Sequence, residues 1–253
     1  MIFAAGLGTR LQPITNTMPK ALVQVEGQPM LWHVVTKLRR AGMTRLVVNV
    51  HHFASQITDY LAANDNFGMD IRVSDESGKL LNTGGGIRKA RPLFDSDSPV
   101  LIHNVDILSN ADLEALYRHA CGDTLLLVSN RPTKRFLLFD DEMRLCGWRN
   151  TDTGAERVQV QRDGLQQLAF SGIHLLSPQL LPLMEPWPDA FGIIDFYMEQ
   201  CATQRLRGWL QQDLRFLDIG KLATLQQASQ FIEDLNSQTP QLPNSPTPQL
   251  LNS

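Results

Sequence analysis

The sequence predicts an α/β fold: a Rossmann-like, mainly parallel sheet with helices on both faces, and a smaller antiparallel extension. Short apolar runs alternate with helical patterns through the first half of the chain, which is typical of βαβ units. The second half carries shorter, less regular strand-like pieces, which favour antiparallel pairing. With 253 residues, 43% of them hydrophobic, the chain can bury a substantial core in one domain.

The first half is expected to form five strands joined by helices. Apolar runs place the strands near residues 1–4, 45–50, 70–74, 99–103 and 124–128. Helical patterns place the helices near residues 30–42, 55–63, 85–93 and 111–119, and Gly42 is suited to end the first. In such sheets ligands bind outside the carboxyl ends of the strands. Binding residues are therefore expected just after the strands.

The second half is expected to add strands near residues 136–139, 158–161, 168–175 and 207–217, with helices near 178–184, 193–203 and 222–235. Residues 1–235 would then form one domain. Beyond it, the proline-rich stretch 239–245 is nearly duplicated by 247–253. Such a polar segment cannot bury enough apolar surface to order itself. Residues 236–253 are therefore expected to be a disordered tail.

Charge and cysteine content exclude several classes of protein. The net charge of -3 and the pI near 6.1 give no overall basic surface, so nucleic acid is not expected as a partner. No apolar run approaches the roughly 20 residues that span a bilayer. Neither a membrane protein nor a secreted one is expected. The three cysteines are scattered and odd in number, which is typical of free thiols in a reducing compartment, so we expect a cytoplasmic protein.

The first expected strand leads directly into a glycine-rich loop, Ala4-Ala5-Gly6-Leu7-Gly8-Thr9-Arg10. Backbone N–H groups in such a loop have no side chains in their way, so a phosphate or a base edge can approach closely. Arg10 and Lys20 add two positive charges beside it. The segment indicates an enzyme that acts on a nucleoside triphosphate.

This loop, together with Pro19-Lys20, resembles the signature of the sugar-1-phosphate nucleotidyltransferases, which make NDP-sugars. Later segments are similar to the same family in the same order: Leu81-Asn82-Thr83-Gly84-Gly85-Gly86-Ile87, His103-Asn104-Val105-Asp106, Phe170-Ser171-Gly172-Ile173 and Phe216-Leu217-Asp218-Ile219-Gly220. The resemblance spans most of residues 1–235. It implies that a sugar 1-phosphate oxygen attacks the α-phosphorus of an NTP and that pyrophosphate leaves.

The resemblance also implies roles for single residues. Arg10 would grip the β and γ phosphates through its planar fork, and Lys20, restrained by Pro19, would place an ammonium at the α-phosphate or the sugar phosphate. The residues expected to contact the nucleotide, mainly through their backbone, are Ala4, Ala5, Gly6, Gly8, Thr9, Gly85 and Gly86. The last two lie at the start of an expected helix, where N–H groups favour a phosphate or a base edge.

Two aspartates are candidate ligands for Mg²⁺. Asp106 and Asp218 each follow an apolar run, and Mg²⁺ is usually held by one or two carboxylates together with phosphate oxygens and water. Two positions depart from the family pattern. Val105 stands where the family commonly has glycine, and Lys221 stands where it commonly has threonine after Asp-x-Gly. Lys221 could add a charge near the phosphates or face water.

The sugar side of the expected cleft is less marked in the sequence. Many members of the family carry a Glu-Lys pair where this chain has Gly147-Trp148-Arg149-Asn150. Arg149 could replace that lysine, and an ordinary loop arginine is an equally good interpretation. The resemblance further implies that Ser171 and Gly172 reach the sugar.

Three other functions are open to test. A dinucleotide-binding oxidoreductase is disfavoured because Leu11 stands where the G-x-G-x-x-G fingerprint needs its third glycine. A metal-dependent glycosyltransferase would use Asp95-Ser96-Asp97, a spacing that here precedes proline and favours a loop. A non-catalytic nucleotide-sugar-binding regulator is disfavoured by the presence of Arg10, Lys20 and both aspartates.

Within the family, the sequence most resembles enzymes that use UTP and an amino-sugar phosphate, N-acetylmuramate 1-phosphate being the best match. GTP with mannose 1-phosphate is the alternative. The residues do not fix the base, the sugar or the oligomeric state.

Overall fold

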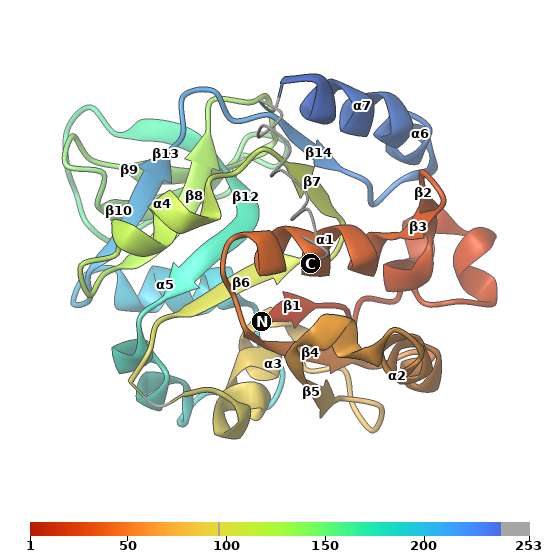
Figure 1. Ribbon diagram of the computed structural model, residues 1–253. Helices are drawn as coiled ribbons and strands as arrows, with labels where there is room; N and C mark the ends of the chain where they lie inside the picture. The colour runs from red at the N-terminus through yellow and green to blue at the C-terminus, as the bar shows by residue number, and fades with distance from the viewer. Residues whose placement is uncertain (96, 239–253) are drawn as a thin grey trace, which may run out of the picture.

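The computed structural model describes residues 1–95 and 97–238, and the first half forms a parallel sheet as predicted (Figure 1). Its strands lie in the spatial order β6-β1-β4-β5. Neighbouring strands in this group are parallel, with Ile2 opposite Val48 on one side and His103 on the other. Their bounds are β1 (Ile2–Phe3), β4 (Arg45–Val50), β5 (Asp70–Asp75) and β6 (Val100–Asn104).

The second half continues the same sheet as the predicted antiparallel extension, on the left of Figure 1. The long strand β12 (Gln166–Leu176) joins the two halves, since it pairs antiparallel with β6, β8 and β9. One pairing differs from the prediction, because β13 runs parallel to β8. The remaining strands are β8 (Thr124–Ser129), β9 (Arg135–Phe139), β10 (Leu145–Asn150), β11 (Glu156–Val158) and β13 (Leu206–Leu210).

Helices cover both faces of the parallel strands, as predicted. Alternate residues of a strand point to opposite faces. Accordingly Val48 of β4 packs in one apolar cluster with α1 and α2, whereas Val47 packs in the other cluster with α3 and α5. The helices are α1 (Met30–Arg40), α2 (Ala54–Ala63), α3 (Asn82–Ala90), α4 (Leu113–Arg118), α5 (Ile193–Gln200), α6 (Leu222–Leu225) and α7 (Ala228–Gln238).

Two small antiparallel ribbons lie beside the main sheet. One pairs β2 (Gln24–Val25) with β3 (Gln28–Pro29), and the other pairs β7 (Ile107–Ser109) with β14 (Phe216–Asp218). The sequence predicted one strand over residues 207–217, but the structure divides this region between β13 and β14. Strands of two or three residues are too short to leave a periodic signal, which explains why β7 was not predicted.

The last described helix continues past the boundary that the sequence analysis expected. Helix α7 continues to Gln238, three residues beyond the predicted boundary at residue 235. The rest of the predicted tail, residues 239–253, lies outside the described residues. Within the described part of the chain, no helix is long and apolar enough to cross a membrane.

Candidate active site

The glycine-rich loop leaves the carboxyl end of β1 and is anchored at both ends. Ala4 and Ala5 are buried, and the Ala4 N–H donates a hydrogen bond of 2.8 Å to the side chain of Asn49. Gly6 is exposed. Gly8 has a φ of +66°, a conformation that glycine adopts without strain, and its carbonyl accepts a 2.8 Å hydrogen bond from the Thr15 hydroxyl. A short 3₁₀ turn, Thr9–Leu11, then carries Arg10.

Four charged side chains from distant segments meet beside this loop. The Lys20 ammonium forms an ion pair with the Asp106 carboxylate. A Cβ built on Gly220 would lie 2.8 Å from Asp218 Oδ1, 2.9 Å from Arg10 Nη2 and 3.0 Å from Lys20 Nζ. These three atoms therefore surround one point. The structure thus brings together both predicted cations and both predicted aspartates.

The β7–β14 ribbon is the element that brings the two aspartates together. Asp106 immediately precedes β7 and Asp218 ends β14, and Asp218 lies opposite Ile107 in the ribbon. The N–H of Ile219 also donates a 2.9 Å hydrogen bond to the Asp106 carbonyl. Lys20 reaches the same place because Pro19 is buried and extended and starts the 3₁₀ turn Lys20–Leu22.

The acidic pair is suited to a hard divalent cation. The Lys20 and Asp106 side chains are only 11% and 14% exposed, so water screens their charges weakly. The described residues contain no group of three or more His, Cys, Asp or Glu side chains that could hold a metal. Mg²⁺ does not need such a group, because phosphate oxygens and water complete its octahedral shell. Two carboxylates, one just before β7 and the other at the end of β14, fit this requirement.

The two departures from the family pattern do not disturb this arrangement. Val105 is 4% exposed and packs in the apolar core, while its N–H donates to the Phe3 carbonyl at 3.1 Å. The backbone therefore approaches β1 closely without a glycine. Lys221 is exposed and immediately precedes α6.

A cavity of about 380 Å³ lies between the glycine-rich loop, β6 and the start of α3. On the loop side it is lined by Ala4, Ala5, Gly6 and Lys20, and on the opposite side by Asn82 and Thr83. Asp106, which pairs with Lys20 in the charged cluster, also lines it. The cavity thus connects a surface of backbone and amide groups with a group of cations and carboxylates.

Gly85 and Gly86, which the sequence assigned to nucleotide binding, instead pack against protein. They lie inside α3 and are buried. A Cβ on Gly85 would lie 2.2 Å from the Asp189 carbonyl oxygen, and one on Gly86 would lie 2.7 Å from Glu76 Oε1. The Gly85 N–H also points to the Phe191 carbonyl at 3.4 Å. These glycines are needed for close packing, and the residues of α3 that line the cavity are Asn82 and Thr83.

A buried amide–carboxylate pair, absent from the sequence prediction, ties the two walls of the cavity together. Asn49 accepts the hydrogen bond from Ala4 and donates one of 2.8 Å to Glu76, which is 1% exposed. Glu76 also accepts from the Leu81 N–H at 3.3 Å, just before α3. The one signal in the sequence is an asparagine within the otherwise apolar run Leu46-Val47-Val48-Asn49-Val50.

Gly172 and Ser171, which were expected to reach the sugar, lie in different surroundings. Gly172, with φ +74°, lies at an irregularity of β12, and a Cβ there would lie 2.6 Å from the side-chain nitrogen of Asn104, which lines the cavity. Ser171 is 1% exposed and its hydroxyl donates to the Leu127 carbonyl at 2.8 Å. That hydroxyl is therefore used inside the sheet.

Arg149 is held away from this segment. Its guanidinium makes two hydrogen bonds to Glu156, of 2.9 and 3.0 Å, and β9 separates its strand from β12. Bidentate pairing of this kind uses the donors that a phosphate would need. Of the two interpretations of Arg149, this pairing favours the ordinary arginine over a replacement of the family lysine.

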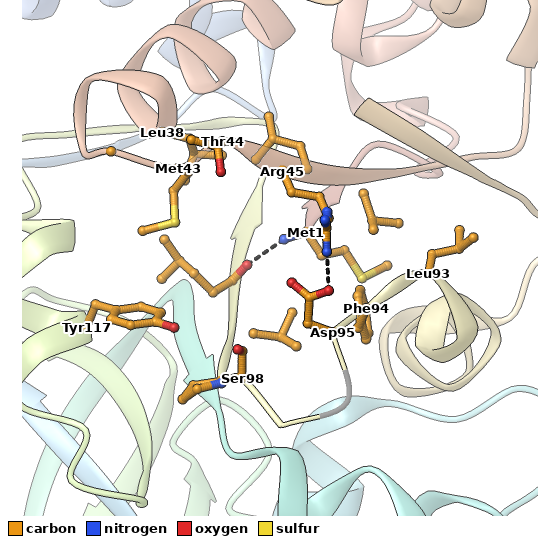
Figure 2. A pocket seen from close by; sticks show the side chains of 16 residues that line it. Met1, Leu38, Met43, Thr44, Arg45, Leu93, Phe94, Asp95, Ser98 and Tyr117 are labelled. Carbon is orange, nitrogen blue, oxygen red and sulfur yellow. Dashed lines mark hydrogen bonds and ion pairs between the residues drawn. The ribbon is translucent and has the colours of Figure 1, made fainter. Parts of the chain in front are cut away.

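A second cavity, of about 440 Å³, lies at the opposite end of the parallel strands (Figure 2). Asp95 forms an ion pair with Arg45 there, and the Met1 amine donates a 2.5 Å hydrogen bond to the Leu101 carbonyl. Asp95 and Asp97, the pair considered for a glycosyltransferase, thus lie near the amino ends of the strands. Ligand sites in open α/β sheets form at the carboxyl ends, so this position disfavours that function.

Comparison with known proteins places the chain among nucleotidyltransferases. The model of the Nucleotidyl transferase family matches residues 1–134, more than half of the chain. The chain is 31% identical to N-acetylmuramate alpha-1-phosphate uridylyltransferase of Neisseria meningitidis serogroup B, over 90% of this chain and 95% of the relative. It is 29% identical to the mannose-1-phosphate guanyltransferase of Schizosaccharomyces pombe, over 74% of this chain and 52% of that protein.

Solved structures show the same fold at low sequence identity. HddC from Yersinia pseudotuberculosis, complexed with GMP-PN, aligns with a TM-score of 0.74 at 22% identity, covering 91% of this chain and 97% of HddC. A UDP-glucose pyrophosphorylase from Acinetobacter baumanii aligns with a TM-score of 0.74 at 16% identity, covering 90% of each chain. Fold, motifs and relatives agree: the chain belongs to the nucleotidyl transferase family and is an enzyme of the kind that forms NDP-sugars.

Proposed function

We propose that the protein transfers UMP from UTP to N-acetylmuramate 1-phosphate and releases pyrophosphate. The observation that carries this proposal is the meeting of Arg10, Lys20, Asp106 and Asp218 at the mouth of a cavity lined by the glycine-rich loop. The choice of base and sugar is supported by the relative from Neisseria meningitidis, which this chain matches over 95% of its length. Mannose 1-phosphate with GTP is the second candidate, supported by a relative matched over 52% of its length.

The reaction needs little covalent participation by the protein. A phosphate oxygen of the sugar 1-phosphate forms a bond to the α-phosphorus, while the bond from the α-phosphorus to the oxygen bridging it to the β-phosphate breaks. The electron pair of that bond leaves with pyrophosphate. Catalysis then depends on alignment of the reactants and on neutralisation of their charge.

Each cation has a place in this scheme. Arg10, carried by the 3₁₀ turn Thr9–Leu11 at the end of the loop, would bind the β and γ phosphates through its planar fork. Lys20, which pairs with Asp106 in the structure, would neutralise the α-phosphate where charge develops. The backbone of Ala4, Ala5, Gly6, Gly8 and Thr9 would cradle the nucleotide. The simultaneous presence of these groups favours a catalyst over a non-catalytic regulator.

Asp106 and Asp218 are the residues that would hold Mg²⁺. When bound, the ion would supply positive charge to the phosphate oxygens. The β7–β14 ribbon keeps the two carboxylates in position for the ion. Because Asp218 Oδ1 accepts a 2.8 Å hydrogen bond from the Gly220 N–H, its orientation is fixed by the backbone.

We also propose that the enzyme works in the cytoplasm with small-molecule substrates and without a nucleic-acid or membrane partner. Its three cysteines, Cys121, Cys146 and Cys201, are free thiols, which suits a reducing compartment. The pI near 6.1 supports the same interpretation.

A substrate matrix tests the proposed function. Each of the four NTPs is combined with N-acetylmuramate, N-acetylglucosamine, glucose and mannose 1-phosphates in the presence of Mg²⁺, and pyrophosphate release is measured. We expect the highest kcat/KM for UTP with N-acetylmuramate 1-phosphate. A clear preference for GTP with mannose 1-phosphate would reverse the ranking. An absence of pyrophosphate with every pair would leave the non-catalytic regulator as the better description.

A further inference from the structure

Arg131, in the loop between β8 and β9, stacks on Phe216, two residues before Asp218 on β14, although no motif pointed to it. Its guanidinium carbon lies 4.5 Å from the centre of the Phe216 ring, and its Nη2 donates a 2.8 Å hydrogen bond to the Phe170 carbonyl. Phe170 immediately precedes the Ser171-Gly172 segment of β12. Arg131 therefore joins β14, which carries Asp218, to the strand expected on the sugar side.

The backbone of β14 places Arg131 on the same side as Asp218. Residues two apart on a strand project to the same face, so Phe216 and Asp218 share a face of the ribbon. Arg131 stacks on the first and acts electrostatically on the second. Burial lowers the pKa of the Arg131 guanidinium, whereas the negative charge of Asp218 acts to raise it. The arginine thus contributes a positive charge at the edge of the acidic pair, apart from Arg10 and Lys20.

The hydrogen-bonding capacity of Arg131 is not used up by the protein. A guanidinium has five N–H donors. Within the described residues, the Nε atom of Arg131 is buried and has no hydrogen-bond partner. A buried charged donor without a partner is destabilising, and an arginine cannot escape this cost by losing its proton. An oxyanion would satisfy both the charge and the free donors.

We propose that Arg131 binds an oxyanion of the sugar substrate next to Asp218. This rests on the proposed function, because the enzyme must then hold an anionic acceptor close to the metal-binding acids. The oxyanion has two sources, the 1-phosphate that all candidate sugars share and the carboxylate that N-acetylmuramate carries in addition. Arg131 would supply the acceptor-side charge for which Arg149 was one candidate, whereas Arg149 donates two hydrogen bonds to Glu156.

Steady-state kinetics of Arg131→Ala and Arg131→Lys test the proposal, with Arg135→Ala as the matched control. Arg135 is an exposed arginine at the start of the neighbouring strand β9. We expect Arg131→Ala to raise the KM for the sugar 1-phosphate by about tenfold or more, the loss of one charge-assisted contact, with little change in the KM for the NTP. Arg131→Lys should recover part of the loss, since it keeps the charge without the fork. Arg135→Ala should behave as the wild type.

Comparison of two acceptors separates the sources of the oxyanion. If Arg131 binds the 1-phosphate, the KM values for N-acetylmuramate and N-acetylglucosamine 1-phosphates rise together. If it binds the carboxylate, only the first rises. Equal increases in the KM values for NTP and sugar, or an unchanged KM for sugar with a lower Tm, would show a purely structural role. Calorimetry of sugar 1-phosphate binding to the wild type and to Arg131→Lys gives the same comparison without turnover. It therefore distinguishes a failure of the Arg131 proposal from a failure of the proposed reaction.

Discussion

The two sides of the cleft, which we propose bind the nucleotide and the sugar, hold their polar groups in different ways. On the nucleotide side, a continuous loop and one lysine, all within residues 4–20, supply the backbone donors and both cations. On the sugar side, Phe170, Arg131 and Phe216 come from three separate strands or loops and meet only in the folded protein. The first side is therefore encoded locally, whereas the second depends on strand pairing.

The difference shows that a sequence motif predicts a contact reliably when local backbone geometry alone positions its residues. Local geometry brings Arg10 and Lys20 to the cluster because the loop and the Pro19 turn fix their positions. Arg149 lies in the region where many members of the family carry a Glu-Lys pair. In the structure it lies opposite Glu156 in the β10–β11 pair and forms an ion pair with it. The cross-strand neighbour Glu156 thus occupies the guanidinium of Arg149. Variants on each side of the cleft test this difference between local and tertiary positioning.

The largest effect is expected from Asp106→Asn and Lys20→Ala on the nucleotide side. Each removes a charge that the proposed reaction uses, so kcat should fall by about 100-fold or more while the fold remains. Pyrophosphate release and a thermal melt measure the two quantities. Asp97→Asn, an exposed aspartate at the opposite end of the strands, is the control and should leave kcat unchanged. A large loss of kcat with Asp97→Asn would contradict the assignment of the reaction to the end of the strands that holds Asp106.

A smaller effect is expected from Asn49→Ala, which cuts the connection between the two cavity walls. The Ala4 N–H and the Glu76 carboxylate would each lose a buried partner, so the free energy of unfolding should fall by about 1–3 kcal/mol. The KM for the NTP should rise by about tenfold if the pair also positions the loop, whereas the KM for the sugar should stay near the wild-type value. Urea unfolding and kinetics at fixed sugar concentration test both statements. Equal changes in the two KM values would mean that the pair serves stability alone.

Gly85→Ala tests whether the glycines of α3 serve close packing against the protein or binding of the nucleotide. Its methyl group would meet the Asp189 carbonyl at 2.2 Å, so overpacking should lower the free energy of unfolding by about 1–3 kcal/mol. Gly6→Ala is the matched comparison for stability, because nothing lies within 4 Å of a Cβ at that position. Denaturant unfolding of both variants is the measurement. A stable Gly85→Ala protein with a raised KM for NTP would return this glycine to nucleotide binding.

The seam between the two halves should make stability depend on pH. His103 on β6 and His174 on β12 are buried, and burial lowers the pKa of each to about 3. Below pH 6.5 the unfolded chain binds protons that the folded one does not. Stability should therefore be complete above pH 6.5 and fall toward pH 3 by about 1.4 kcal/mol per pH unit for each histidine. Urea unfolding between pH 7 and 4 should show a shallower slope for His174→Gln, whereas His52→Gln, at an exposed position, should keep the wild-type slope.

The smallest effect is expected from Arg149→Ala on the sugar side. Its ion pair with Glu156 is partly exposed, and such pairs contribute about 0–1 kcal/mol to stability. We expect the KM for the sugar 1-phosphate to change by less than about twofold, since the corresponding difference in binding free energy is below about 0.5 kcal/mol. An increase comparable to that of Arg131→Ala would place the acceptor contact on β10 after all.

Much of the fold could be predicted because its signals are local. The alternation of apolar runs and helical patterns placed β4, β5, β6, β8 and most helices within a few residues of their observed bounds. Strand β7 was missed because three residues carry no period, and β10 because its mixed sequence, Leu145-Cys146-Gly147-Trp148-Arg149-Asn150, lacks clear alternation. The parallel pairing of β13 with β8 depends on contacts between segments far apart in the chain.

The sequence by itself determined the α/β class, the glycine-rich loop and the membership of a nucleotidyltransferase family, because each rests on neighbouring residues and their order. Only the tertiary structure decided which charged groups share a site. Hydrogen bonding between β7 and β14 places Asp106 beside Asp218, Glu156 pairs with Arg149, and Arg131 stacks on Phe216. The physical reason is that charges act over a few ångströms of space, whatever their separation along the chain.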